Sequence, residues 1–118
     1  STPAVALARN VPRKRAMEML LTGDMVDAAT AADWGLINRT VPADQLAAGT
    51  LALAGRIAAK SPHVVQMGKR GFYEQVETDT MRAYRATAKL MTENMLADDA
   101  AEGIDAFLEK RAPTWSGR

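Results

Sequence analysis

The chain has 118 residues, and its 15 lysines and arginines nearly balance its 14 aspartates and glutamates, which leaves a formal net charge of +1. This balance gives no general basis for binding to nucleic acid or to a membrane surface. The absence of cysteine excludes disulfides and thiolate metal sites. It also fits a reducing compartment, so we expect a cytoplasmic location. No apolar run approaches the roughly 20 residues of a membrane span. Few aromatic residues and many alanines favour helix over strand, so the composition predicts a soluble, mostly helical chain.

Two short helices are predicted at the beginning of the chain. The first covers residues 1–10, with Ser1 or Thr2 as its cap. The second covers residues 13–22, where apolar side chains recur at helical spacing, and Gly23 provides a left-handed stop. The abrupt start, without the composition of a flexible tail, suggests a chain cut from something longer.

A third short helix and a strand are predicted next. Asp27 is a plausible N-cap for a helix over residues 28–34, which Gly35 ends. Residues 36–41 alternate in polarity and include β-branched side chains, so they predict a short strand or an extended segment.

Three longer helices follow. The first covers about residues 44–60. Ser61 and the proline after it predict the start of a second helix through about residue 76. Thr78 is the expected cap of a third helix, over about residues 79–96.

The helix at residues 79–96 has an amphipathic seam that suits a neighbouring helix or another subunit. Its members recur every three or four residues and are Met81, Tyr84, Ala88, Met91 and Met95.

The last predicted helix covers about residues 99–110. Asp99 followed three residues later by Glu102 resembles a capping box at its start. An extended tail follows, and its Trp115 either docks the tail or covers a ligand.

Several charged residues are candidates for chemistry, each beside a plainer interpretation. Asp98, Asp99 and Glu102 could form a carboxylate cluster for acid–base work, but capping and the helix dipole explain them equally well. His63 stands alone, without a residue placed to form a catalytic dyad with it. Four basic residues could contact a phosphate or simply solvate a helix start. They are Arg9, Arg13, Lys14 and Arg15.

Two glycines and two residues of the last helix complete the candidates. Gly68 and Gly71 lack the surroundings of a phosphate-binding loop, and close helix packing explains them better. Phe107 and Lys110 are three residues apart and share a helix face, so a ring and an ammonium group could meet one ligand. Alternatively, cations near a helix C-terminus only complement the helix dipole.

Three motifs in order resemble the crotonase superfamily of enoyl-CoA hydratases and isomerases. They are AMEMLLTG, AADWGLINRTVP and EGIDAFLEKRAPTW, and together they span nearly the entire chain. The chain departs from the pattern at residues 1–4, where many hydratases have a glycine-rich turn. The resemblance is closer to the enoyl-CoA hydratase domain-containing branch.

The resemblance implies that residues 1–118 are the C-terminal helical portion of a crotonase-like α/β fold. Members of that family are roughly twice as long. Their N-terminal spiral part, absent from this chain, carries the CoA site, two oxyanion-hole amides and any catalytic glutamates. The C-terminal part builds trimers, often paired into hexamers. We therefore expect a homo-oligomer, no catalytic residue in this segment and no metal site.

The family's reaction stabilises a thioester enolate with two amides while carboxylates move protons or water. The resemblance thus implies an acyl-CoA substrate and no tightly bound cofactor. It also places Phe107 and Lys110 where the last helix of a neighbouring subunit approaches the CoA adenine and phosphate. The rival hypothesis is a non-catalytic helical oligomerisation or interaction module.

Overall fold

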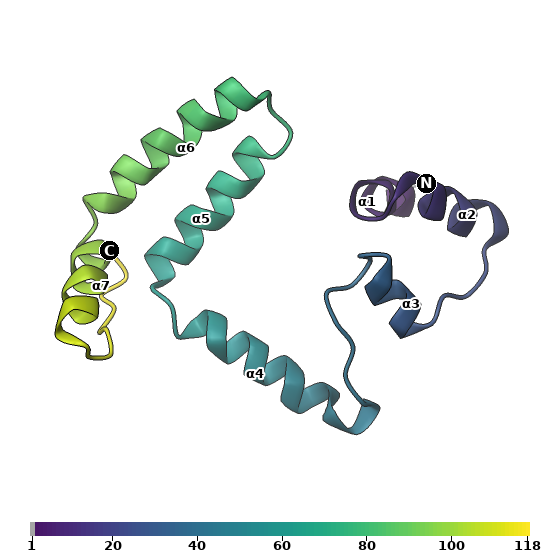
Figure 1. The fold of residues 1–118 in the computed structure, drawn as a ribbon, viewed down its shortest axis with the longest axis horizontal. Coiled ribbons are helices and arrows are strands. Elements are labelled where there is room, and N and C mark those ends of the chain that lie inside the picture. The colour runs from purple at the N-terminus through teal and green to yellow at the C-terminus, as the bar shows by residue number, and fades with distance from the viewer. Residues whose placement is uncertain (1) are drawn as a thin grey trace. The chain divides into compact units, whose positions relative to one another are not determined.

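A computed structural model describes residues 2–118, and most of them are helical (Figure 1). The elements are α1 (Thr2–Asn10), α2 (Arg13–Thr22), α3 (Ala28–Asp33), the 3₁₀ helix η1 (Ala43–Gln45), α4 (Leu46–Ala58), α5 (Pro62–Gln75), α6 (Thr80–Met95) and α7 (Asp98–Glu109). The seven predicted α-helices are therefore confirmed for the described part of the chain. None of them is long and apolar enough to cross a membrane.

The chain forms two compact units, Ser1–Gly49 and Thr50–Arg118. In the first unit α1 packs against α2. The buried apolar side chains of this unit are small, and they are Val11, Ala16 and Ala31.

Local stop and cap signals set the helix ends of the first unit. Gly23 has the left-handed φ of 69° that the sequence predicts, and its N–H donates to the Met19 carbonyl. Asp27 caps α3, because its Oδ1 accepts a 2.8 Å hydrogen bond from the Thr30 N–H. The predicted cap at Ser1 lies outside the described residues.

Residues 36–41 were predicted as a short strand or an extended segment, and the strand is wrong. The N–H groups of Leu36 and Ile37 both donate to the Ala31 carbonyl, at 2.9 and 3.3 Å, so this segment begins as a continuation of the turn that ends α3. A strand needs a neighbouring strand to accept and donate its backbone hydrogen bonds. Residues 2–118 contain no strand that could pair with it.

In the second unit α5 and α6 form an antiparallel hairpin, and α7 packs against both (Figure 1). Ser61 caps α5 as predicted, with its Oγ accepting from the Val64 N–H at 3.0 Å. At the start of α6 the prediction is off by one residue. Asp79 is the cap, since its Oδ1 accepts from the Arg82 N–H at 3.0 Å. Thr78 instead donates its hydroxyl to the Gln75 carbonyl.

Close contact between α5 and α6 depends on a glycine. A Cβ at Gly71 would lie 2.2 Å from Cδ2 of Leu90, whereas a Cβ at Gly68 would meet nothing within 4 Å. Tight helix packing, the explanation expected for both glycines, therefore holds for Gly71 and not for Gly68.

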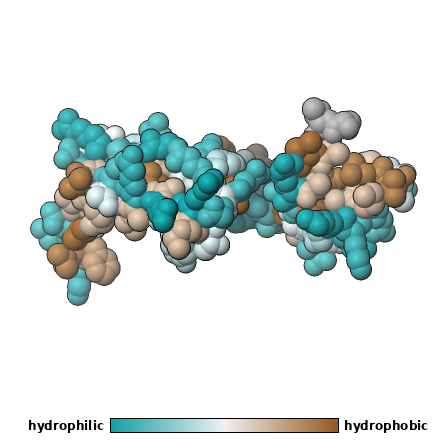
Figure 2. Space-filling view, turned by 90° about the horizontal axis from the view of Figure 1, so that it is seen from above, coloured by the Kyte–Doolittle hydropathy of each residue, from teal (hydrophilic) through white to brown (hydrophobic). Residues whose placement is uncertain are grey.

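The amphipathic seam of α6 is exposed. Tyr84 and Met91 are 71% and 60% accessible, and the side of α6 that faces its neighbours contains Ala83, Thr87 and Leu90 instead. Hydrophobic side chains reach the surface in several places on the face that Figure 2 shows. The second unit buries little apolar area of its own, with Met67 and Ala106 as its buried apolar side chains.

The two glycines of α5 provide a matched test of this packing. Replacement of either by alanine gains the same helix propensity, up to about 1 kcal/mol. Only Gly71→Ala forces Leu90 out of its present rotamer. The clashing atom is the end of a flexible side chain, so we expect Gly71→Ala to be about 1 kcal/mol less stable than Gly68→Ala. Urea unfolding of both variants measures the difference. Equal stabilities would show that the close contact between α5 and α6 does not depend on Gly71.

Candidate functional site

The C-terminal end of α7 presents an aromatic ring and an ammonium group. Phe107 is 81% accessible, and Lys110 is also exposed. Lys110 is the only non-glycine residue with a positive φ among residues 2–118, at φ 54° and ψ 36°. The structure therefore places both predicted site residues at the surface, at the same end of one helix.

A hydrogen-bonded turn ends α7 at Lys110. The Lys110 N–H donates to the Phe107 carbonyl at 3.3 Å, and the Arg111 N–H donates to the Ala106 carbonyl at 3.0 Å. These two bonds are the Schellman motif, in which the residue with positive φ is usually glycine. A lysine here takes the conformation at a cost in free energy, since its Cβ crowds the backbone.

An apolar groove of about 720 Å³ lies beside Phe107 in the second unit. Residues of α5, α6, α7 and the tail line it, including Val64, Met95, Ile104, Phe107, Leu108 and Trp115. Lys110 does not line the groove. Phe107 thus borders an apolar groove and precedes the exposed Lys110 by three residues.

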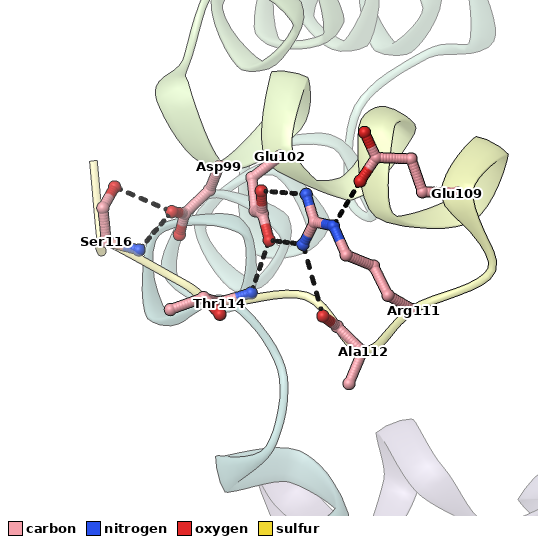
Figure 3. A network of polar contacts seen from close by, with 7 residues as sticks. All are labelled: Asp99, Glu102, Glu109, Arg111, Ala112, Thr114 and Ser116. Atoms are coloured by element: carbon pink, nitrogen blue, oxygen red, sulfur yellow. Dashed lines mark hydrogen bonds and ion pairs between the residues drawn. The ribbon is translucent and has the colours of Figure 1, made fainter.

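A cluster of salt bridges is centred on Arg111, the residue after Lys110 (Figure 3). The Arg111 guanidinium binds both oxygens of Glu102, with Nη1–Oε1 at 2.6 Å and Nη2–Oε2 at 2.9 Å. Its Nε also donates to Glu109 Oε2 at 2.5 Å. The Thr114 N–H donates to Glu102 Oε1 at 2.6 Å. We refer to Glu102, Glu109, Arg111 and Thr114 as the Arg111 clamp.

The Arg111 clamp keeps Glu102 ionised. Hydrogen bonds from the Arg111 side chain and then from the Thr114 N–H lower the pKa of Glu102 from its ordinary value of 4.5 to about 2. Hydrogen bonds to Glu102 and then to Glu109 raise the pKa of Arg111 above its ordinary value. Both groups are therefore charged throughout the physiological range.

Asp99 is the most enclosed charged side chain of the second unit, at 1% accessibility. Its Oδ2 accepts from the Ser61 hydroxyl at 2.5 Å. Its Oδ1 accepts from the N–H and the hydroxyl of Ser116 at 2.6 and 2.9 Å (Figure 3). The Gly117 N–H donates to both oxygens. Burial alone would raise the pKa of Asp99, but the hydrogen bonds from Ser61, Ser116 and Gly117 outweigh it and lower the pKa to about 2.

The predicted capping box is therefore wrong. The N-cap of α7 is Ala97, which provides no side-chain hydrogen bond. Asp99 and Glu102 turn toward the tail and bind its N–H groups, while Asp98 pairs with Arg118 at 3.2 Å. The three carboxylates hold the tail and do not converge on one point as an acid–base cluster would.

The tail is docked, as one of the two interpretations of Trp115 proposed. The Trp115 indole N–H donates to the Ala59 carbonyl at 2.9 Å. Its ring lies against Gly103, where an added Cβ would be 3.5 Å from the ring. The Asp99 N–H also donates to the Arg118 carbonyl, at 2.9 Å.

The other candidates carry no convergent chemistry. Arg15 pairs with Glu18 at 3.0 Å and stacks over the Trp34 ring at 4.8 Å, so local contacts occupy this part of the basic cluster. His63 is half-buried in the first turn of α5. Within residues 2–118, no group of three or more histidine, aspartate or glutamate side chains is arranged to hold a metal ion.

Sequence reasoning did not identify Arg111 as part of this site. Its partner Glu102 lies nine residues earlier in the chain, and only the turn at Lys110 brings the two together. A signal was available, because an arginine that directly follows a helix can fold back onto an acidic side chain of that helix.

The chain is similar in sequence to proteins of one family. The sequence profile of the enoyl-CoA hydratase/isomerase family matches residues 2–118. Mouse enoyl-CoA hydratase domain-containing protein 3, a mitochondrial protein, is 47% identical over 116 residues, which are 98% of this chain and 39% of the mouse protein. Enoyl-CoA hydratase EchA19 of Mycobacterium tuberculosis is 38% identical over 115 residues, covering 98% of this chain and 43% of that protein.

Solved structures show the same similarity. The crystal structure of an enoyl-CoA hydratase of Mycobacterium smegmatis matches with a TM-score of 0.94 at 49% identity and covers 98% of this chain and 45% of that one. Human enoyl-CoA hydratase domain-containing protein 3 matches with a TM-score of 0.95 at 47% identity, covering 98% and 46%. This chain therefore spans less than half the length of these relatives. The comparisons do not support the expected cytoplasmic location, because the vertebrate relatives are named as mitochondrial.

Acid should weaken the attachment of the tail. Because Asp99 and Glu102 have lowered pKa values in the folded chain, their contribution is complete above about pH 4.5 and is lost as the pH falls toward about 2. We expect Asp99→Asn to lower the melting temperature at pH 7 by about 5 °C. The variant should also lose less stability than the unmodified protein on acidification.

Asp105→Asn is the matched control, since Asp105 is an exposed aspartate of the same helix. Scanning calorimetry of the whole protein at several pH values measures both variants. Identical pH profiles for Asp99→Asn and Asp105→Asn would contradict the assigned role of Asp99.

Proposed function

Because this chain belongs to the enoyl-CoA hydratase/isomerase family, we propose that the whole protein is an acyl-CoA enzyme of that family, a hydratase (lyase) or an isomerase. Its reaction stabilises a thioester enolate with backbone amides, a form of electrostatic catalysis. Acyl-CoA is the substrate, and the reaction needs no tightly bound cofactor. The catalytic groups lie outside residues 1–118.

We propose two roles for this segment, which is the C-terminal helical portion of the whole protein. It provides oligomerisation surfaces for a homotrimer or hexamer, and α7 forms part of the rim of a CoA site in a neighbouring subunit. Phe107 packs against the adenine ring, and the Lys110 ammonium pairs with a phosphate. The observation that carries this proposal is the exposure of Phe107 and Lys110 together at the end of α7.

The chemistry of the pair fits such a ligand. An exposed aromatic ring provides a flat apolar surface for a base, with a stacking energy of about 1–3 kcal/mol in nucleic-acid complexes. The Lys110 ammonium forms no ion pair with another residue of the described chain. It is therefore free to meet an anion from outside.

The exposed seam of α6 supports oligomerisation. Met81, Tyr84, Met91 and Met95 are each more than half accessible. A row of large apolar side chains on one helix is typical of a surface that another chain covers.

The alternative is a helical oligomerisation module without chemistry, which the same seam would support. An assay with crotonyl-CoA separates the two functions. Hydration or isomerisation by the whole protein supports the enzyme, whereas CoA binding without turnover favours the module.

Loss of the lysine charge should weaken CoA binding. We expect Lys110→Ala to raise the dissociation constant for CoA about tenfold, since a charge-assisted contact contributes about 1.5 kcal/mol. Isothermal titration calorimetry on the whole protein measures this constant. Lys69→Ala, at an exposed lysine of α5, is the control and should not change it. An unchanged affinity in Lys110→Ala would remove Lys110 from the site.

A charge placed in the seam of α6 should break the oligomer. We expect Met91→Glu to convert the whole protein to smaller species, because it buries an unpaired carboxylate in the interface. Lys89→Gln gives the same change in net charge on another side of α6 and should leave the assembly intact. Multi-angle light scattering compares the two. A Met91→Glu variant that assembles normally would exclude this seam as the interface.

A further inference from the structure

We propose that Arg111 and Glu102 are positioning residues for CoA recognition, which hold Lys110 in its left-handed conformation and keep its ammonium free for the ligand. This inference rests on the proposed function of Lys110 and adds residues that do not themselves touch CoA. The observations that carry it are the backbone conformation of Lys110 and the contacts of the Arg111 clamp.

The backbone at Lys110 needs to be held in place. The residue has a positive φ that L side chains rarely adopt, and no other non-glycine residue of the described chain does so. Strained residues of this kind persist where the surrounding structure fixes them, and they are concentrated at functional sites. The two backbone bonds of the Schellman motif fix the turn from the side of α7.

The Arg111 clamp fixes the same turn from the other side. Arg111 follows Lys110 directly, and its guanidinium binds Glu102 with two parallel hydrogen bonds of 2.6 and 2.9 Å. This bidentate arrangement fixes orientation as well as distance. The next part of the tail is tied to the same carboxylate through the Thr114 N–H. The chain on both sides of Lys110 is therefore anchored to α7.

The clamp also removes the nearest competitor for the lysine ammonium. Glu109 immediately precedes Lys110, and its carboxylate accepts from Arg111 Nε at 2.5 Å. Without Arg111, that carboxylate would be free to pair with the lysine next to it or to repel an anionic ligand. Arg111 thus orients Lys110 and also neutralises the charge beside it.

This arrangement distinguishes Arg111 from an ordinary surface arginine. Arg70 is also paired with two glutamates, Glu74 at 3.7 Å and Glu93 at 3.4 Å, but both contacts are longer and neither is bidentate. Arg70 lies on α5, away from any residue with positive φ. It is therefore a matched control for the loss of one arginine and two ion pairs.

A double-mutant cycle on CoA binding tests the inference in the whole protein. We expect Arg111→Ala to raise the dissociation constant for CoA about fivefold, and Arg70→Ala to leave it unchanged. In a Lys110→Ala background, Arg111→Ala should have less than a twofold further effect, because it acts through Lys110. A purely structural role would give the same factor in both backgrounds and would overturn the inference.

Glu102→Gln covers the case in which Arg111→Ala fails to fold. It keeps the shape of the side chain and removes the charge that the guanidinium binds, so we expect a weakening similar to that of Arg111→Ala. Unchanged affinity in Glu102→Gln would overturn the inference. If Lys110→Ala itself leaves CoA binding unchanged, both the proposed function of Lys110 and this inference fail. If Lys110→Ala weakens binding and Arg111→Ala does not, only this inference fails.

Discussion

The second unit depends on one buried carboxylate. Asp99 is almost fully removed from water, and a charge in that position is tolerated only where hydrogen bonds replace its hydration. Its partners come from two distant parts of the chain, Ser61 at the start of α5 and Ser116 with Gly117 in the tail. The Ser61 hydroxyl both caps α5 and donates to Asp99, so one side chain links the beginnings of α5 and α7. One buried carboxylate thus joins the beginning of α5, the beginning of α7 and the tail.

The tail connects the hydrogen bonds at Asp99 to the C-terminal end of α7. The tail leaves α7 at Lys110 and returns along the helix to Asp99, and its Trp115 bonds to the Ala59 carbonyl on the way. Arg111 joins the departing chain to Glu102 in the middle of α7. A tail without regular structure is therefore bonded to α7 at Glu102 and at Asp99, and it supports the helix that presents Phe107. A side chain on such a support has a defined geometry, which the proposed role of Phe107 in CoA binding would need.

Local signals were sufficient to predict most of the helices. Gly23 ends α2, and Ser61 with the proline after it begins α5, because each effect depends on residues within one helical turn. The failures involve partners that are distant or absent. Residues 36–41 have a strand-like pattern, but the described chain offers them no neighbouring strand. Asp99 has the spacing of a capping box, yet its partners lie 17 to 38 residues away, which no local pattern can indicate.

The left-handed backbone conformation of Lys110 is unusual for a lysine and says more about this position than its exposure does. Glycine would adopt the left-handed conformation there at no steric cost, whereas a residue with a Cβ gives up roughly 1–2 kcal/mol. Gly23, at the equivalent point after α2, follows the usual pattern. The two helix ends differ in what surrounds them. The residue after Lys110 is Arg111, which binds Glu102, and the exposed ring of Phe107 lies three residues before Lys110. The proposed contact between the Lys110 ammonium and a CoA phosphate would account for a lysine in a conformation that glycine adopts more easily.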